Sequence, residues 1–191
     1  MSIRHPAFLF WQPQADYLRY LSKSKLGKKL LIFLNYVIWL IFLYLSYLLI
    51  KFDFSLFWLL FLATLLAELT ERLIKKKIFW CRPMFIRHDS TPVGLVDKWY
   101  RSGAFPSGHT IKATIFLLLL ISFPVFPLWL FFLIVIPLLC FRVLIGFHYP
   151  ADILGGVIIA LLIWFLISPL KIYTPIDSYL QLIFNTIFLI N

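Results

Sequence analysis

Three short clusters carry side chains suited to phosphate chemistry, and each borders an apolar stretch. The clusters are Lys75 followed after six residues by Arg82-Pro83, then Pro106-Ser107-Gly108-His109, and last Arg142 followed by His148 and Asp152. A phosphoryl group in transfer spreads negative charge over its oxygens, which fixed donors or metal ions must meet. Lys75, Arg82 and Arg142 supply such donors, because a guanidinium stays ionised in a low-dielectric site and contacts phosphate through two N–H groups.

The second cluster precedes an apolar run and therefore predicts a helix N-terminus. Backbone N–H groups and the helix dipole favour an anion there, and Gly108 lets the backbone approach it closely. Helix capping by Ser107 explains these residues about equally well if the cluster stands alone. His109 has little reason to lie there for core packing. We predict that it is the general acid that protonates the leaving oxygen and later helps to activate water.

The third cluster predicts a histidine–carboxylate pair at the start of a helix. His148 precedes Pro150, a favoured first helical residue, and Asp152 falls in the first turn, where it can reach back toward the imidazole. Asp152 would hold one ring nitrogen as a donor and leave the other as a nucleophile. A buried histidine satisfied by Asp152 would explain the pair, but not its company of three cations.

Together the clusters resemble the K-x6-R-P, P-S-G-H and S-R-x5-H-x3-D motifs of the type 2 phosphatidic acid phosphatase superfamily, which includes the vanadium haloperoxidases. The resemblance covers about residues 54–168, and one position departs from it, since Phe141 stands where the family usually has Ser. It implies that His148 is the nucleophile, Asp152 its orienting partner and His109 the acid. The phosphate-holding residues that it implies are Lys75, Arg82, Ser107, Gly108 and Arg142.

No metal or other cofactor is expected. The clusters contain no group of carboxylates of the kind that Mg²⁺ or Ca²⁺ requires, and the two histidines with Asp152 have a sufficient other role. Cys81 and Cys140 make no disulfide framework. Two free thiols are the simpler interpretation, and a disulfide between them stays open if their face of the membrane is oxidising.

Composition places these clusters in a membrane protein. Hydrophobic residues make up 62% of the 191 positions and charged residues only 14%, against about 25% in soluble domains. The formal charge of +10 comes from Lys and Arg gathered in the first 29 residues and between Arg72 and Lys112, which flank apolar stretches. This placement suits phosphate-bearing lipids and argues against nucleic acid as a partner.

We predict an all-α fold, a single domain over residues 1–191 built as a polytopic transmembrane bundle of five spans. Residues 1–29 form an interfacial segment, residues 30–168 the transmembrane core and residues 169–191 a C-terminal interfacial segment or a short sixth span. No removable signal peptide is expected, because the first span itself would direct insertion. The predicted spans are 30–50, 54–74, two within 113–141 divided near Pro124 and Pro127, and 150–168.

The charges at the end of the second span have a structural explanation. At a spacing of four residues Glu68 can pair with Arg72 and Glu71 with Lys75, and we favour these helix salt bridges over a catalytic carboxylate. The long polar connection 76–106 follows, and a connection of this length is usually functional. His88 within it receives no catalytic role.

The predicted function is that of an integral membrane lipid phosphatase acting through phosphohistidine. The candidate substrates are phosphatidylglycerophosphate, phosphatidic acid, undecaprenyl pyrophosphate and the 1-phosphate of lipid A. A lipid-to-lipid phosphotransferase and a non-catalytic lipid-binding protein remain as alternatives, and the oligomeric state is left open. Span parity puts residues 1–29 and all three clusters on one face. The positive-inside rule would make that face cytoplasmic. The resembled family generally has its sites on the other side, so we expect a periplasmic or extracytoplasmic face of a bacterial inner membrane.

Overall fold

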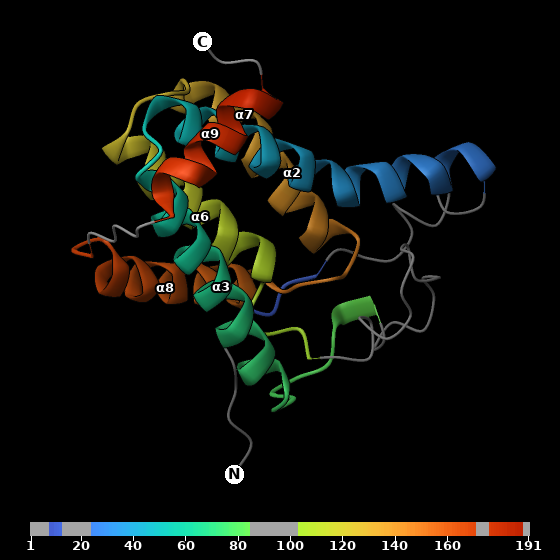
Figure 1. Cartoon of the computed structure of the whole chain (residues 1–191). Coiled ribbons are helices and arrows are strands. Elements are labelled where there is room, and N and C mark those ends of the chain that lie inside the picture. The colour runs from blue at the N-terminus through green and yellow to red at the C-terminus, as the bar shows by residue number, and fades with distance from the viewer. Residues whose placement is uncertain (1–7, 13–23, 85–102, 171–175, 189–191) are drawn as a thin grey trace.

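Apolar stretches form helices throughout the described part of the chain. The computed structural model describes residues 8–12, 24–84, 103–170 and 176–188, and these contain helices and no strand (Figure 1). The helices are α2 (Lys25–Phe52), α3 (Leu56–Lys75), α6 (Gly108–Ser122), α7 (Leu128–Leu144), α8 (Pro150–Ile167) and α9 (Asp177–Ile187). The all-α class predicted from the sequence is confirmed.

Local sequence signals set the ends of these helices. Ser24 caps α2 by accepting a hydrogen bond from the Gly27 N–H at 2.9 Å, as expected for a residue at an N-cap. At the turn between α2 and α3, Asp53 accepts from the Ser55 N–H at 2.9 Å. The uncharged run after the second cluster divides into α6 and α7 at Phe123 to Pro127, close to the prolines that predicted the division.

Two helices are long and apolar enough to cross a membrane by length and composition, namely α2 with 28 residues and α8 with 18. α3 has 20 residues, but Glu68, Glu71 and Arg72 lie in its last third. α6 and α7 are apolar but shorter, with 15 and 17 residues. The fold is therefore a helical bundle with two candidate membrane spans among the described residues, which indicates membrane association. The five-span arrangement is taken up under the proposed function.

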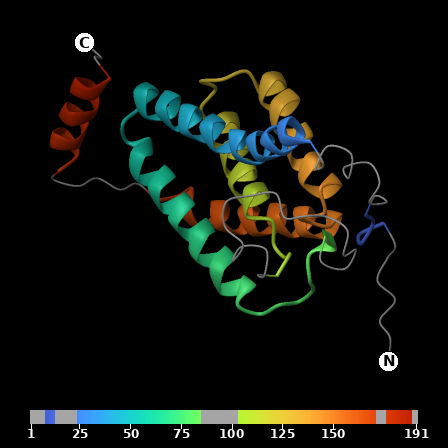
Figure 2. The same ribbon diagram turned by 90° about the vertical axis from the view of Figure 1, so that its right-hand side faces the viewer.

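α6 lies at the centre of the bundle and contacts α2, α3, α7 and α8 (Figure 2). Its contact with α8 is the most extensive, and small residues make it close. A Cβ atom added at Gly156 would lie 2.9 Å from both the Ser107 carbonyl oxygen and the Thr110 Cβ. Any larger residue at position 156 would therefore push α8 away from the start of α6.

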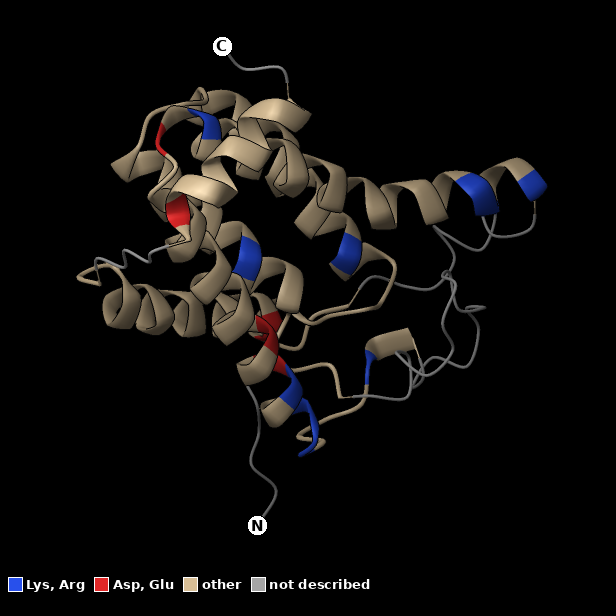
Figure 3. Cartoon of the chain, viewed as in Figure 1, with Lys and Arg blue, Asp and Glu red and all other residues tan. Residues whose placement is uncertain are grey.

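The outer faces of the helices carry large apolar side chains. Leu133 on α7 is 63% exposed, Leu43 on α2 70% and Phe165 on α8 78%. Contiguous exposed apolar surface on this scale is rare in water-soluble monomers and marks contact with a membrane or a partner. Figure 3 shows most of the described charged residues near helix ends or around the middle of the view, with long uncharged stretches of helix elsewhere. This distribution suits a lipid environment.

Part of the N-terminal segment reaches the start of α8. The Leu9 carbonyl accepts a hydrogen bond from the Ala151 N–H at 3.0 Å. The Phe10 ring lies 5.1 Å from the Trp80 ring and 5.2 Å from the Tyr149 ring, centroid to centroid. Residues 24–29 of the predicted interfacial segment instead form the N-cap and first turn of α2, so this helix begins before the predicted boundary at residue 30. Residues 1–7 and 13–23 lie outside the described residues, as do His88 and most of the polar connection, residues 85–102.

α9 packs near the turn that joins α2 and α3. The Trp58 Nε1–H donates to Asp177 Oδ1 at 2.7 Å, and the Tyr47 ring lies 4.9 Å from that of Phe188. Eleven residues rise about 17 Å, well short of a hydrocarbon core about 30 Å thick. This length fits the predicted C-terminal interfacial segment better than a sixth span.

Candidate functional site

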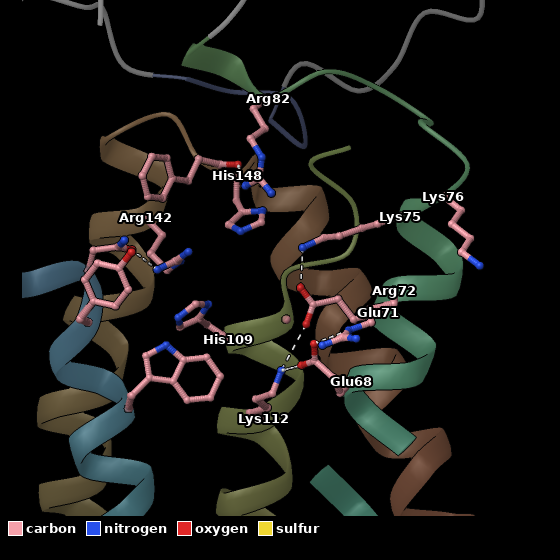
Figure 4. Close-up of a pocket in the computed structure, with 15 residues that line it drawn as sticks. Glu68, Glu71, Arg72, Lys75, Lys76, Arg82, His109, Lys112, Arg142 and His148 are labelled. Atoms are coloured by element: carbon pink, nitrogen blue, oxygen red, sulfur yellow. Dashed lines mark hydrogen bonds and ion pairs between the residues drawn. The ribbon is translucent and has the colours of Figure 1, made fainter. Parts of the chain in front are cut away.

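A cavity of about 540 Å³ opens at the end of the bundle where α3 and α7 end and α6 begins (Figure 4). α2 forms one wall, and residues that follow α3 and precede α8 complete the lining. The lining residues are Asn35, Tyr36, Trp39, Glu68, Glu71, Arg72, Lys75, Lys76, Arg82, Gly108, His109, Lys112, Arg142, Phe147 and His148. All three clusters singled out in the sequence thus contribute to one cavity.

Three predicted phosphate-binding cations reach this cavity from three different elements. Lys75 ends α3, Arg82 follows that helix, and Arg142 lies in the last turn of α7. The two arginines are nearly buried, at 6% and 7% exposure, and one Nη of Arg82 donates to the Phe147 carbonyl at 3.1 Å. The guanidinium of Arg142 lies 5.3 Å over the Phe147 ring. Concentrated positive charge in a sheltered cavity favours an anionic ligand.

His148 has one ring nitrogen fixed by the backbone. Its Nδ1 lies 2.9 Å from the Ala104 carbonyl oxygen, which can only accept, so Nδ1 carries the hydrogen and Nε2 keeps its lone pair. Burial first, and then the positive charges of Arg82 and Arg142, hold the pKa of His148 well below its usual range. The imidazole is therefore neutral at neutral pH and has a free nitrogen for attack.

Asp152 lies behind His148 and does not line the cavity. Its Oδ2 accepts from the Tyr149 N–H at 2.7 Å and its Oδ1 from Trp80 Nε1–H at 2.8 Å. The distance from Oδ2 to His148 Nδ1 is 3.4 Å, longer than a good hydrogen bond. Asp152 therefore has the predicted capping position beside the imidazole, whereas the nearer acceptor for Nδ1 is the Ala104 carbonyl. The carboxylate is close enough to stabilise positive charge on the ring.

His109 stands in the first turn of α6 and faces the same cavity as His148 (Figure 4). Its Nε2 is buried and has no hydrogen-bond partner among the described residues. The Trp39 ring lies against it edge to face, with 5.2 Å between ring centroids. A histidine nitrogen left open toward a cation-lined cavity suits the transfer of a proton to or from a bound ligand.

Ser107 and Gly108, the two residues before His109, differ in their position relative to the cavity. Ser107 is fully buried, lies outside the cavity lining and caps α6, its Oγ accepting from the Thr110 N–H at 3.4 Å and also from the Thr110 hydroxyl at 2.9 Å. Its capping role is thus visible, and phosphate binding by its hydroxyl stays a prediction. Gly108 does line the cavity, and a Cβ there would overlap the Glu71 carboxylate. A larger residue at position 108 would therefore displace the Glu71 carboxylate at the point where α3 touches the start of α6.

The predicted salt bridges of α3 are confirmed, and they are part of a larger network. Arg72 Nε lies 2.8 Å from Glu68 Oε1, and Lys75 Nζ lies 2.5 Å from Glu71 Oε1. Lys112 of α6, only 6% exposed, bridges both carboxylates, at 3.0 Å from Glu68 and 3.2 Å from Glu71. The network ties the cavity-facing end of α3 to α6.

Sequence reasoning did not identify Lys112, Asn35, Tyr36 and Trp39 as cavity residues. Two of them carried a usable signal, since a lysine in the second turn of an apolar helix and an amide inside an uncharged span are costly unless they have a partner. Tyr36 and Trp39 carried none, because aromatic residues are abundant along all of α2.

The donor set of the cavity is cationic rather than metal-ligating. Among the described residues no group of three or more His, Cys, Asp and Glu is arranged to hold a metal ion. The two cavity carboxylates are both engaged by cations, Glu68 by Arg72 and Lys112 and Glu71 by Lys75 and Lys112. Cys81 and Cys140 are both free and exposed.

A family model described as the PAP2 superfamily matches residues 56–174, which is more than half of the chain and includes all three clusters. The chain belongs to this superfamily, and membership supports phosphatase activity. No curated protein and no solved structure matches the chain. α2 and its cavity residues lie before the matched region.

Proposed function

We propose that this protein is an integral membrane lipid phosphatase that transfers a phosphoryl group from a lipid to His148 and then to water. The observation that carries the proposal is the free Nε2 of a neutral His148, held in a cavity with Lys75, Arg82 and Arg142. Neutral imidazole beside three fixed cations is the arrangement that in-line attack on a phosphate dianion needs.

In the first step His148 Nε2 attacks phosphorus, the bond from phosphorus to the lipid oxygen breaks, and His109 gives its proton to that oxygen. The lipid alcohol leaves, and His148 becomes a cationic phosphohistidine. Asp152, with its carboxylate 3.4 Å from Nδ1, stabilises that new charge, while the Ala104 carbonyl keeps the Nδ1 hydrogen in place.

In the second step His109 takes a proton from water as the water oxygen attacks phosphorus. The bond from phosphorus to Nε2 breaks, and inorganic phosphate leaves with His148 neutral again. Lys75, Arg82 and Arg142 meet the charge on the phosphoryl oxygens in both steps. These cations supply the charge stabilisation that a metal ion gives in other phosphoryl-transfer enzymes, so we propose catalysis independent of added metal.

We further propose that α2, α3, α6, α7 and α8 all enter the bilayer as the five spans of the bundle, with the cavity at its extracytoplasmic end. The support is the exposed apolar surface of these helices and the long stretches of helix that carry no charge. The shorter α6 and α7 fit a locally thinned bilayer. A lipid phosphate could then reach the cavity while its acyl chains stay in the membrane.

The test is a panel of purified lipid phosphates in detergent, assayed for release of inorganic phosphate with and without EDTA. The panel contains phosphatidic acid, phosphatidylglycerophosphate, undecaprenyl pyrophosphate and lipid A bearing a 1-phosphate. Phosphate release from one lipid, unchanged by EDTA, is the expected result. Activity lost on chelation and restored by Mg²⁺ would refute metal independence.

The same panel separates the alternatives. A phosphotransferase would release little phosphate from a single purified lipid and would require a second lipid hydroxyl as acceptor. A non-catalytic lipid-binding protein would turn over none of the panel. We favour hydrolysis, because His109 faces the same cavity as His148 and can activate water there without a second lipid.

A further inference from the structure

We infer that α2, which lies outside the family match, supplies two positioning residues to the site: Asn35 orients Arg142 for phosphate binding, and Trp39 orients His109 for proton transfer. The inference deepens the proposed function and rests on it for the roles of Arg142 and His109. Its two contacts, however, are observed independently of any activity.

Asn35 is a polar residue in the middle of an apolar helix. It is only 6% exposed, and its Oδ1 accepts a hydrogen bond from an Nη of Arg142, a residue 107 positions further along the chain. A buried amide in an apolar helix is costly unless it has a partner, and a hydrogen bond to a charged group is among the stronger kinds. Arg142 is thereby held between the Asn35 amide and the face of the Phe147 ring.

The residue before Arg142 is engaged in apolar packing. Phe141 packs against an apolar cluster that includes Leu31 and Met84. No hydroxyl is available beside Arg142 from that position. Asn35 supplies a neutral polar partner for the guanidinium from a different helix, and so α2 becomes part of the phosphate-binding site.

Trp39 lies one helical turn beyond Asn35 and faces the same cavity. Its ring contacts the His109 imidazole edge to face at 5.2 Å between centroids, and the Lys112 ammonium lies 5.3 Å over the same ring. Since His109 Nε2 has no hydrogen-bond partner in the described part of the chain, ring packing is the described contact that sets its direction. Trp39 thus fixes where the proton of His109 points.

The two positioning roles predict changes in different parameters, anion binding for Asn35 and kcat for Trp39. Asn35→Leu, which is similar in volume, should weaken anion binding roughly tenfold, raising both the Kd for orthovanadate and the KM for the lipid with a smaller change in kcat. Trp39→Leu should lower kcat at least about tenfold and alter the pH profile of kcat, with the orthovanadate Kd unchanged. Orthovanadate binding by calorimetry requires no turnover, so a wild type that binds it without hydrolysing any lipid would refute the proposed function alone.

Two variants on the same helix serve as controls. Ser46→Ala removes a hydroxyl that bonds back to the Phe42 carbonyl, and Tyr44→Leu removes an exposed aromatic ring near Phe126. Both lie outside the cavity lining and should keep wild-type Kd, KM and kcat. Thermal unfolding of every variant in detergent shows which of them are folded, and Asn35→Ala replaces Asn35→Leu if the latter is not.

A double-mutant cycle decides whether Asn35 acts through Arg142. In an Arg142→Ala background, the Asn35 substitution should change the orthovanadate Kd no further, because the residue that it orients is absent. Additive losses in the cycle would overturn the inference for Asn35, as would a wild-type Kd and KM in the single variant. Wild-type kcat and pH profile in Trp39→Leu would overturn the inference for Trp39.

Discussion

At the scale of single residues, the proposed mechanism depends on one ring nitrogen of His148 being open. The Ala104 carbonyl fixes the hydrogen on Nδ1, and burial, followed by the nearby arginines, holds the pKa of His148 low and keeps the ring neutral. Because the acceptor is a backbone carbonyl, a substitution at position 104 would not remove it. The path of the backbone therefore determines the tautomer of His148. In the mechanism that we propose, the carboxylate of Asp152 is then available to stabilise the positive charge of the phosphorylated ring.

We predict that His148→Ala abolishes phosphate release while the protein remains folded and binds orthovanadate weakly. In the wild type, activity should persist as the pH falls through the ordinary histidine pKa of about 6.5. The lowered pKa keeps His148 unprotonated, so its loss to protonation occurs only at lower pH. The measurement is kcat/KM against pH. Near-normal turnover in His148→Ala, or an acid limb above pH 6.5, would contradict the role of this residue.

For Asp152→Asn we predict a large fall in kcat with a small change in KM, since the carboxylate acts only as the ring gains charge. The structure adds a second effect. Asp152 accepts from Trp80 and from the Tyr149 N–H, and an amide can keep only one of these two bonds. Thermal unfolding should therefore occur at a lower temperature, by the equivalent of about 1–3 kcal/mol. Trp80→Phe, which removes one donor, should lower stability but leave most of kcat.

The residues that we propose for the chemistry could be singled out in the sequence because their types are rare in an apolar chain and their spacing is fixed. Their supporting contacts could not. Ala104 contributes a carbonyl, and every residue has one. Asn35 and Trp39 reach the cavity only because α2 crosses α6 and α7, a packing choice that residue spacing within α2 does not specify. Lys112 carried a signal through its place in an apolar helix, yet its partners on α3 depend on how those two helices align.

At the scale of elements, salt bridges from Lys112 join α6 to α3, and a close backbone approach at Gly156 joins α8 to α6. Both junctions lie beside the cavity, so the helices that carry Lys75, His109 and Asp152 are fixed to each other near the reacting atoms. Helix starts and ends were predicted to within a few residues from prolines, caps and charge. The number of helices that cross the membrane could not be derived in the same way, because the apolar lengths of α6 and α7 fall below the usual requirement.

The salt bridges between α3 and α6 predict that loss of Lys112 lowers the stability of the protein more than loss of Arg72 does. Lys112→Met should destabilise the protein by about 3–5 kcal/mol, because it leaves Glu71 partly buried beside one partner fewer. Arg72→Met should cost at most about 1 kcal/mol, since the side chain of Arg72 is 72% exposed. Thermal unfolding in one detergent compares the two. Equal losses would mean that Lys112 is not a buried anchor between α3 and α6.

The close packing of α8 against the start of α6 at Gly156 predicts that Gly156→Ala moves α8 away from α6. The new methyl group would lie 2.9 Å from the Ser107 carbonyl and from Thr110, and neither group is at the free end of a flexible side chain. We expect lower stability by about 1–3 kcal/mol and a reduced kcat, because α8 carries Asp152 to His148. Ala160→Gly on the same helix would add no bulk and serves as the control for changes in helix propensity. Wild-type kcat in Gly156→Ala would show that this spacing tolerates adjustment.

At the scale of the whole molecule, the shared cavity fixes which helix ends lie together. The end of α3, the start of α6, the end of α7 and the start of α8 all contribute to the site. The turn between α2 and α3 lies at the far end of both helices, where α9 also packs. One end of the bundle thus holds the reacting groups, and the other holds Lys51, Asp53 and Asp177.

This arrangement makes the orientation testable with two positions at opposite ends. Lys77 follows α3 at the cavity end and Lys51 lies in the last turn of α2 at the other, and both are exposed. Single cysteines would replace each of them in a background with Cys81 and Cys140 changed to serine, and intact cells would be treated with a membrane-impermeant thiol reagent. We expect Lys77→Cys to be labelled in intact cells and Lys51→Cys only after permeabilisation, because the proposed site faces away from the cytoplasm. The reverse pattern would place the site in the cytoplasm, in line with the positive charge near it. Labelling of both positions in intact cells would mean that α2 and α3 do not cross the membrane.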